Sequence, residues 1–119
     1  MALRFTKMQG AGNDFVVIDH RDGVSAPDRA TLAWIADRHF GIGCDQILIL
    51  EPPHRIASLA SYRVVNADGS EARQCGNGAR CLAAWLHRDG NLVDHAVLDS
   101  PSGPVPVRHL IDDRFEATL

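Results

Sequence analysis

The segment 78–89 has the pattern of a helix that is apolar on nearly every side, and this feature constrains the fold more than any other. Its apolar residues are Ala79, Cys81, Leu82, Ala83, Ala84, Trp85 and Leu86. Such a helix is stable only when other elements surround it. Gly90 and Asn91 are turn residues that end it. Because the chain has 119 residues, we expect one domain built around this helix.

Short β-type runs separated by turns make up most of the remaining chain. Strands are predicted at residues 3–8, 15–18, 46–50, 59–65, 95–99, 105–110 and 114–119. A second helix is predicted over 27–40, because residues 25–28 have the form of a capping box and Gly41 closes the run. Its apolar residues at helical spacing are Leu32, Ile35, Ala36 and Phe40. Trp34 and Trp85 are assigned to packing. Strands that wrap one buried helix give an α+β domain.

The thiol of Cys75 comes directly before the apolar helical segment, with Gly76 and Gly78 close behind it. The first N–H groups of a helix lack intrahelical partners and its dipole is positive there, so a thiol at this position is favoured as its thiolate. The same N–H groups can hold a carboxylate. Cys75 is therefore a candidate base or nucleophile beside an anion site. The alternative is a buried structural thiol, the commoner fate of a free cysteine.

Composition argues against several classes of function. A net charge of −3 with scattered Lys and Arg gives no basic surface for nucleic acid. Residues 1–7 lack the apolar region of a signal peptide, and no stretch approaches the ~20 apolar residues of a membrane helix. We therefore expect a cytoplasmic protein. The three cysteines form no C-x-x-C pair and the six histidines show no metal-binding spacing, so reduced thiols and no metal are expected.

Several polar and glycine residues have an ordinary structural explanation. Asn13 and Asn66 are typical turn residues, and Gln46 is a polar residue entering a strand. Gly10 and Gly12 are weak evidence for a phosphate loop, because no G-x-x-x-x-G-K-[ST] motif and no G-x-G-x-x-G motif opening a βαβ unit is present.

Three segments carry a recognisable pattern in a fixed order and spacing. They are residues 5–15, with Gly12-Asn13-Asp14-Phe15; residues 38–46, with Gly43-Cys44-Asp45-Gln46; and residues 66–81, with Cys75-Gly76-Asn77-Gly78. Together they resemble the N-terminal half of the diaminopimelate epimerase family, which comprises cofactor-independent amino-acid epimerases of bacterial lysine and cell-wall synthesis. The resemblance covers essentially all 119 residues.

The family resemblance implies a specific fold and reaction. The fold is a diaminopimelate epimerase-like lobe, with mostly antiparallel strands around one buried central helix and a second, peripheral helix. Residues 1–119 are the N-terminal lobe of a two-lobe enzyme, which is a homodimer as the full-length protein. The reaction converts LL-diaminopimelate to meso-diaminopimelate: one cysteine removes the α-proton and a second donates a proton to the opposite face. Cys75 matches the first cysteine, and the implied substrate contacts are Asn13, Gln46, Asn66, Gly76 and Asn77.

Some features of the family are absent from this chain. The second cysteine and the contacts to the distal end of the substrate belong to the missing C-terminal lobe. Cys81 is no substitute, because six residues after Cys75 it lies roughly 600° further round the helix and is expected in the core. Cys44 stands where the family usually has an apolar residue. Gln9 replaces an expected histidine and receives no role, and Ala11 replaces a larger apolar residue.

Two other functions remain open from the sequence. One is a thiol redox protein that uses Cys75, although no resolving cysteine is apparent. The other is a non-catalytic binding lobe for a small amino-acid-like anion. Residues 114–119 begin a strand and stop without turn chemistry, so the chain is expected to be truncated and inactive by itself.

Overall fold

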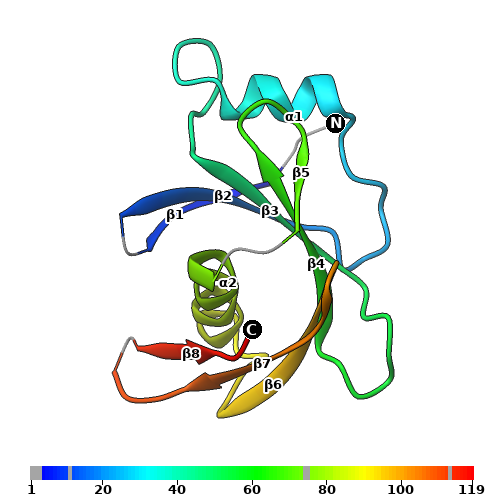
Figure 1. Cartoon of the computed structure of the whole chain (residues 1–119), viewed down its shortest axis with the longest axis vertical. Helices are drawn as coiled ribbons and strands as arrows, with labels where there is room; N and C mark the ends of the chain where they lie inside the picture. The colour runs from blue at the N-terminus through cyan, green and yellow to red at the C-terminus, as the bar shows by residue number, and fades with distance from the viewer. Residues whose placement is uncertain (1–3, 11, 74–75, 113) are drawn as a thin grey trace.

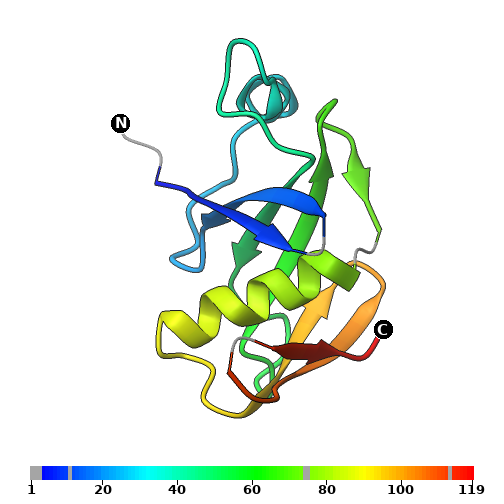
Figure 2. The same cartoon turned by 90° about the vertical axis from the view of Figure 1, so that its left-hand side faces the viewer.

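The computed structural model describes residues 4–10, 12–73, 76–112 and 114–119. Within these residues the chain forms one curved, eight-stranded sheet with a helix on each face (Figures 1 and 2). The elements are β1 (Thr6–Gly10), β2 (Asn13–Asp19), α1 (Arg29–Ala36), β3 (Gln46–Glu51), β4 (Ala60–Asn66), β5 (Glu71–Ala72), α2 (Gly76–Arg88), β6 (His95–Ser100), β7 (Gly103–His109) and β8 (Phe115–Ala117). The expected α+β class is confirmed.

The sheet has the strand order β1-β2-β3-β4-β6-β7-β8, and β5 pairs with β4 beside this path. Two neighbouring pairs, β2 with β3 and β4 with β6, are parallel, and the other pairs are antiparallel. A parallel pair needs a crossover connection, and each helix lies in one of them. The mostly antiparallel arrangement is confirmed. The two-residue strand β5 was not predicted, because it has no β-type pattern of its own.

Helix α2 lies inside the curve of the sheet, as Figure 1 shows. It packs against β1, β2, β7 and β8. Its residues Ala79, Leu82, Ala83 and Leu86 have no exposed surface. Burying one leucine fully stabilises a fold by about 1.5–3 kcal/mol relative to leaving it exposed. The prediction of a buried central helix is confirmed, and the helix begins two positions before the expected residue 78.

Helix α1 is peripheral, as expected, but shorter than the predicted 27–40. It begins after Asp28, whose carboxylate accepts a hydrogen bond from the Thr31 N–H at 2.8 Å, so Asp28 is the N-cap and the helix starts two residues later than predicted. It ends at Ala36, because the following Asp37 is extended and its carboxylate accepts hydrogen bonds from the N–H groups of His39 and Phe40.

The helix–sheet contacts divide the core into two layers. Phe15 and Val17 of β2 face α2, whereas Val16 and Ile18 face α1. Strand β3 is likewise buried on both faces. The layer between the sheet and α2, here called the inner layer, contains more buried residues than the layer between the sheet and α1. No helix in the described part of the chain is long and apolar enough to cross a membrane.

Three aromatic side chains test the predicted packing. Trp85 packs against the inner layer and donates from Nε1 to Thr6 Oγ1 at 3.2 Å, so its packing role is confirmed. Trp34 is 56% exposed, so its predicted packing role was wrong, and Phe40 is 78% exposed outside α1, so its predicted place in the helix was wrong. Trp34 faces away from the sheet on the outer helix, and Phe40 lies beyond the end of that helix.

Candidate functional site

The first turn of α2 contains Gly76 and Asn77, two of the residues implied as substrate contacts. Gly76 lies close to Leu119, the last residue of the chain: a Cβ at position 76 would lie 3.2 Å from Leu119 Cδ1. Cys75, the predicted base, lies outside the described residues, so its placement stays a prediction.

Asn13, at the start of β2, is hydrogen-bonded to the first turn of α2. Asn77 donates from Nδ2 to Asn13 Oδ1 at 2.9 Å, although 64 residues separate them. Arg80, one turn further along α2, donates to Asn77 Oδ1. Asn13 in turn donates from Nδ2 to Asp45 Oδ2 over 3.5 Å, the longest of these contacts. The structure thus brings two predicted site residues together and adds Arg80 and Asp45 as partners.

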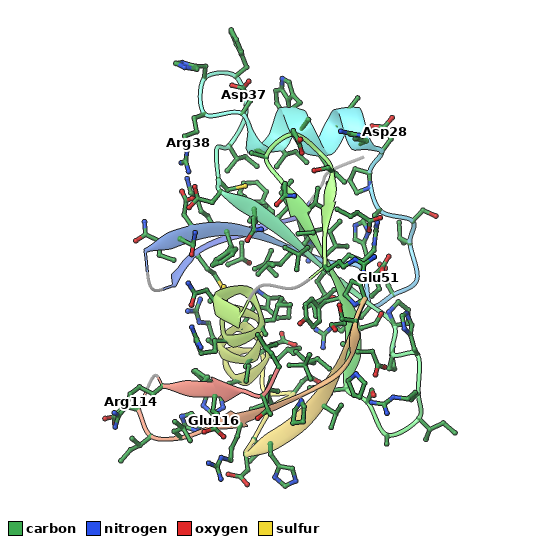
Figure 3. All side chains as sticks on the ribbon, in the orientation of Figure 1. Asp28, Asp37, Arg38, Glu51, Arg114 and Glu116 are labelled. Atoms are coloured by element: carbon green, nitrogen blue, oxygen red, sulfur yellow. The ribbon has the colours of Figure 1, made fainter. Side chains whose placement is uncertain are left out.

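An ion-pair cluster anchors the Asn13 end of this series. Arg38 donates to both carboxylate oxygens of Asp14, at 2.9 and 3.0 Å, and to Asp45 Oδ1 at 2.9 Å. The backbone N–H groups of the two aspartates also cross-link them: Asp14 N donates to Asp45 Oδ2 and Asp45 N to Asp14 Oδ1. Figure 3 shows Arg38 pointing from the connection after α1 toward the sheet. These contacts therefore hold the β1–β2 hairpin against the start of β3.

The same cluster sets the charge state of Asp14. The hydrogen bonds from Arg38 are the largest cause that holds the pKa of the Asp14 carboxyl well below its usual value, and they outweigh the opposing effect of its desolvation. The Asp14 side chain is only 15% exposed, and Lys7 lies 3.6 Å from it. This carboxylate is thus a fixed negative charge of the structure.

Gln46 and Asn66 form a second amide pair. They face each other where β3 begins and β4 ends, and Gln46 Nε2 donates to Asn66 Oδ1 at 3.1 Å. Asn66 donates from Nδ2 to Ser70 Oγ at 3.2 Å, and its backbone N–H donates to Ser70 O at 2.7 Å. Gly69 supplies the left-handed residue of this turn, with φ of 86°. The Asn66 side chain is therefore fixed by the strand and by the turn after it.

Sheet topology places both amide pairs at one end of the sheet. Asn13 starts β2 and Gln46 starts β3, and these strands run parallel with Phe15 paired to Gln46. Asn66 ends the antiparallel strand β4, so it lies at the same end. We call Asn13, Gln46, Asn66 and Asn77 the amide group. It consists of neutral side chains, which orient a zwitterionic ligand without adding a charge that competes with it.

A hollow of about 550 Å³ lies beside Asn77, between β1, α2 and the β7–β8 connection. Its polar lining residues include Asn77, Arg80 and Arg114, the last of these from the β7–β8 connection. Gln9 also lines it. Two arginines are thus among the residues that line this hollow.

The two cysteines that the structure describes are both buried. Cys44 is 2% exposed and Cys81 is 5% exposed, and Cys81 Sγ lies 3.7 Å from Met8 Sδ. Burial is the main cause that raises the pKa of the Cys44 thiol. The expected core position of Cys81 is confirmed. Among the described residues, no three His, Cys, Asp or Glu side chains gather where they could hold a metal ion.

Sequence reasoning missed Arg38, Asp45 and Arg80 as site partners. All three lie inside the segments that carried the family resemblance, but their partners are distant in the chain. A signal was present in the sequence: charged residues flank the predicted contacts in each segment.

The family model for diaminopimelate epimerase matches residues 5–117 of this chain. The chain belongs to the diaminopimelate epimerase family. It is 61% identical over 118 residues to the diaminopimelate epimerase of Xylella fastidiosa strain M12, covering 98% of this chain and 42% of that protein. It is 57% identical to the diaminopimelate epimerase of Xanthomonas axonopodis pv. citri strain 306, with the same coverage of 98% and 42%. The chain therefore spans less than half the length of these diaminopimelate epimerases.

Solved structures share the fold at much lower sequence identity. A "Predicted Epimerase" from Pseudomonas aeruginosa superposes with a TM-score of 0.71 at 20% identity, covering 98% of this chain and 42% of that chain. A methylitaconate-delta-isomerase gives a TM-score of 0.74 at 10% identity, covering 93% and 35%. A probable proline racemase from Agrobacterium radiobacter gives 0.70 at 14% identity, covering 95% and 39%. The expected diaminopimelate epimerase-like lobe is thus confirmed as the fold.

Proposed function

We propose that this chain is the N-terminal lobe of a two-lobe diaminopimelate epimerase, which converts LL-diaminopimelate to meso-diaminopimelate without a cofactor. Family membership and 61% identity to a protein named diaminopimelate epimerase support the reaction. The observation that carries the site is the hydrogen bond from Asn77, in the first turn of α2 directly after Cys75 in the sequence, to Asn13, with the Gln46–Asn66 pair at the same end of the sheet. The complete protein is proposed to be a cytoplasmic homodimer.

In the proposed reaction, the Cys75 thiolate takes the α-proton of the substrate on its sulfur. The electron pair left on the α-carbon spreads onto the adjacent carboxylate. N–H groups of Gly76 and Asn77 at the start of α2 stabilise that charge more in the transition state than in the ground state. A cysteine of the C-terminal lobe then gives its proton to the opposite face of the same carbon. Asn13, Gln46 and Asn66 orient the substrate through their amides.

This division of work explains why the lobe is proposed to be inactive alone. One thiol can remove the proton but leaves the opposite face without an acid. We expect residues 1–119 to show no epimerisation, and the complete protein to show it. Turnover by the isolated lobe would remove the second cysteine from the mechanism.

The role of Cys75 is tested by α-hydrogen exchange in the complete protein. LL-Diaminopimelate in deuterated water should gain α-deuterium with the unaltered protein, and Cys75→Ala should slow this exchange by at least about 10³-fold. Cys81→Ala is the matched control, since it removes a buried thiol from the same helix and should retain the exchange. Exchange that persists in Cys75→Ala would exclude Cys75 as the base.

Of the two other functions, the redox role has little support. A reversible cycle needs a second accessible thiol, whereas Cys44 and Cys81 are both buried. A non-catalytic binding lobe would instead bind diaminopimelate in the complete protein without any α-hydrogen exchange, so the same experiment separates it from the epimerase.

A further inference from the structure

The series Arg80, Asn77, Asn13 and Asp45 has only one possible direction of hydrogen bonding. A guanidinium group has donors only, and a carboxylate has acceptors only. With these two groups at the ends, both intervening amides must turn their carbonyl oxygens toward Arg80 and their NH2 groups toward Asp45. The end groups therefore determine the orientation of two side chains that a chemically neutral setting would leave free to flip.

The Asp45 end of the series is itself fixed. Its Oδ1 accepts from Arg38 at 2.9 Å, and its Oδ2 accepts from the Asp14 backbone N–H at 3.0 Å. Two partners on different elements thus hold the carboxylate plane. Rotation of Asp45 away from Asn13 would break at least one of these hydrogen bonds to its carboxylate.

We propose that Arg80 and Asp45 are positioning residues that orient Asn77 and Asn13 so that this corner of the site offers N–H donors and selects a carboxylate. Each NH2 group carries two N–H bonds and uses one of them within the series, and no other residue in the described part of the chain accepts the second, which is available to a ligand. Each carbonyl oxygen already faces a donor. The inference rests on the proposed function, because it assigns the ligand contacts to these two amides.

The consequence is discrimination between a carboxylate and a carboxamide. A primary carboxamide presents its own N–H groups, which meet donors in the oriented site. If either end group is removed, an asparagine can flip and accept from the carboxamide. A site whose polar groups cannot pair with an analogue rejects it strongly, so loss of the orientation should appear as a loss of this preference.

The test compares the binding of LL-diaminopimelate with that of its diamide by calorimetry. The complete protein carries Cys75→Ala to prevent turnover. Arg80→Met and Asp45→Asn should each lower the preference for the diacid about tenfold. Arg80→Lys keeps a donor and should retain the preference. Arg114→Met is the matched control, because Arg114 is a lining residue of the same hollow but not a member of the series, and this change should leave the preference within about twofold. Contacts to the distal carboxylate are unchanged and cancel between variants.

A second measurement separates this proposal from the proposed function. In the ligand-free complete protein, one side-chain N–H each of Asn13 and Asn77 should be protected from hydrogen exchange, and Arg80→Met should remove that protection. Protection and preference that both survive in Arg80→Met and Asp45→Asn would overturn the positioning role, whatever the activity. A protein that neither binds nor epimerises diaminopimelate would overturn the proposed function, and exchange at Asn13 and Asn77 would then decide whether the end groups orient the amides.

Discussion

The side chains of Gln46 and Asn66 meet across β3 and β4, with Gln46 Nε2 donating to Asn66 Oδ1 at 3.1 Å. Asn66 then donates to Ser70, so its carbonyl and its NH2 group are both engaged. In this arrangement Gln46 turns its NH2 group toward Asn66. The NH2 group of Gln46 therefore fixes the orientation of the Asn66 side chain.

Gln46→Glu should disturb this pair without changing its size. A carboxylate at position 46 cannot donate to Asn66 Oδ1, so Asn66 must turn and lose its bond to Ser70. We expect kcat/KM for LL-diaminopimelate in the complete protein to fall about 10–100-fold, the effect of losing one or two hydrogen bonds. Asn91→Asp adds the same charge at an exposed position after the opposite end of α2 and should change kcat/KM by less than about threefold. Equal effects of the two variants would indicate a general charge effect.

Gly69→Ala should destabilise the turn that holds Asn66. Gly69 has φ of 86°, and a Cβ there would lie 2.6 Å from Arg29 Cγ and 2.7 Å from Arg29 O. Conformational strain and overlap together should lower the free energy of unfolding by about 2–4 kcal/mol. Gly90→Ala is the matched variant, since Gly90 has φ of 88° and no atom within 4 Å of its added Cβ. It should cost about 1 kcal/mol. Denaturant unfolding of both variants measures the difference, and equal costs would contradict the overlap with Arg29.

Asp14 should contribute stability that is lost in acid. Because hydrogen bonds from Arg38 lower its pKa in the folded state, the unfolded chain, with a pKa of about 3.9, binds the proton first as the pH falls. The contribution is therefore complete above about pH 5 and declines below pH 4. Asp14→Asn should lower the free energy of unfolding at pH 7 by about 1–2 kcal/mol, since Arg38 is 54% exposed and solvent weakens the pair.

Urea unfolding of the complete protein between pH 7 and pH 3 checks this prediction. The unaltered protein should lose stability across the acid range more steeply than Asp14→Asn. Arg38→Met removes the partner of Asp14, so the double variant should lose less stability than the two single losses added together. Additive losses would show that the two residues act independently.

The buried cysteines should resist modification in the folded protein. Burial raises the pKa of Cys44 and keeps its thiolate scarce at neutral pH, and Cys81 is enclosed beside Met8. Alkylation of both by iodoacetamide at pH 8 should be at least about tenfold slower in the folded protein than in urea, as followed by peptide mass spectrometry. Rapid labelling of either residue in the folded protein would contradict its burial.

The central helix could be predicted from sequence because its signal is local. Residues from 78 onward are apolar on several faces, and such a segment has to be enclosed. Strand β5 could not be predicted, because Glu71–Ala72 pairs with β4 through a turn and has no alternation of its own. Phe40 matched the helical spacing, but the hydrogen bonds of Asp37 ended α1 before it. Local competition of this kind is not visible in a periodic pattern.

The candidate site could be predicted only in part. Asn13, Gln46, Asn66 and Asn77 came from the family resemblance, since spacing alone also fits ordinary turns. Their partners depend on contacts across the fold: 32 residues separate Asn13 from Asp45. Such pairings are set by sheet register and helix placement, which single residues do not encode. The role of Cys75 stays a prediction.

Because α2 is enclosed by strands from both ends of the chain, its first turn meets Asn13 only after residues 64 positions apart have come together. Closing a loop of that length is entropically costly and is repaid only when many contacts form at once. The core around α2 and the contact between Asn13 and Asn77 therefore form together, in one cooperative event. A substitution that destabilises the core around α2 should therefore also weaken ligand binding, even when the substituted residue lies far from the ligand.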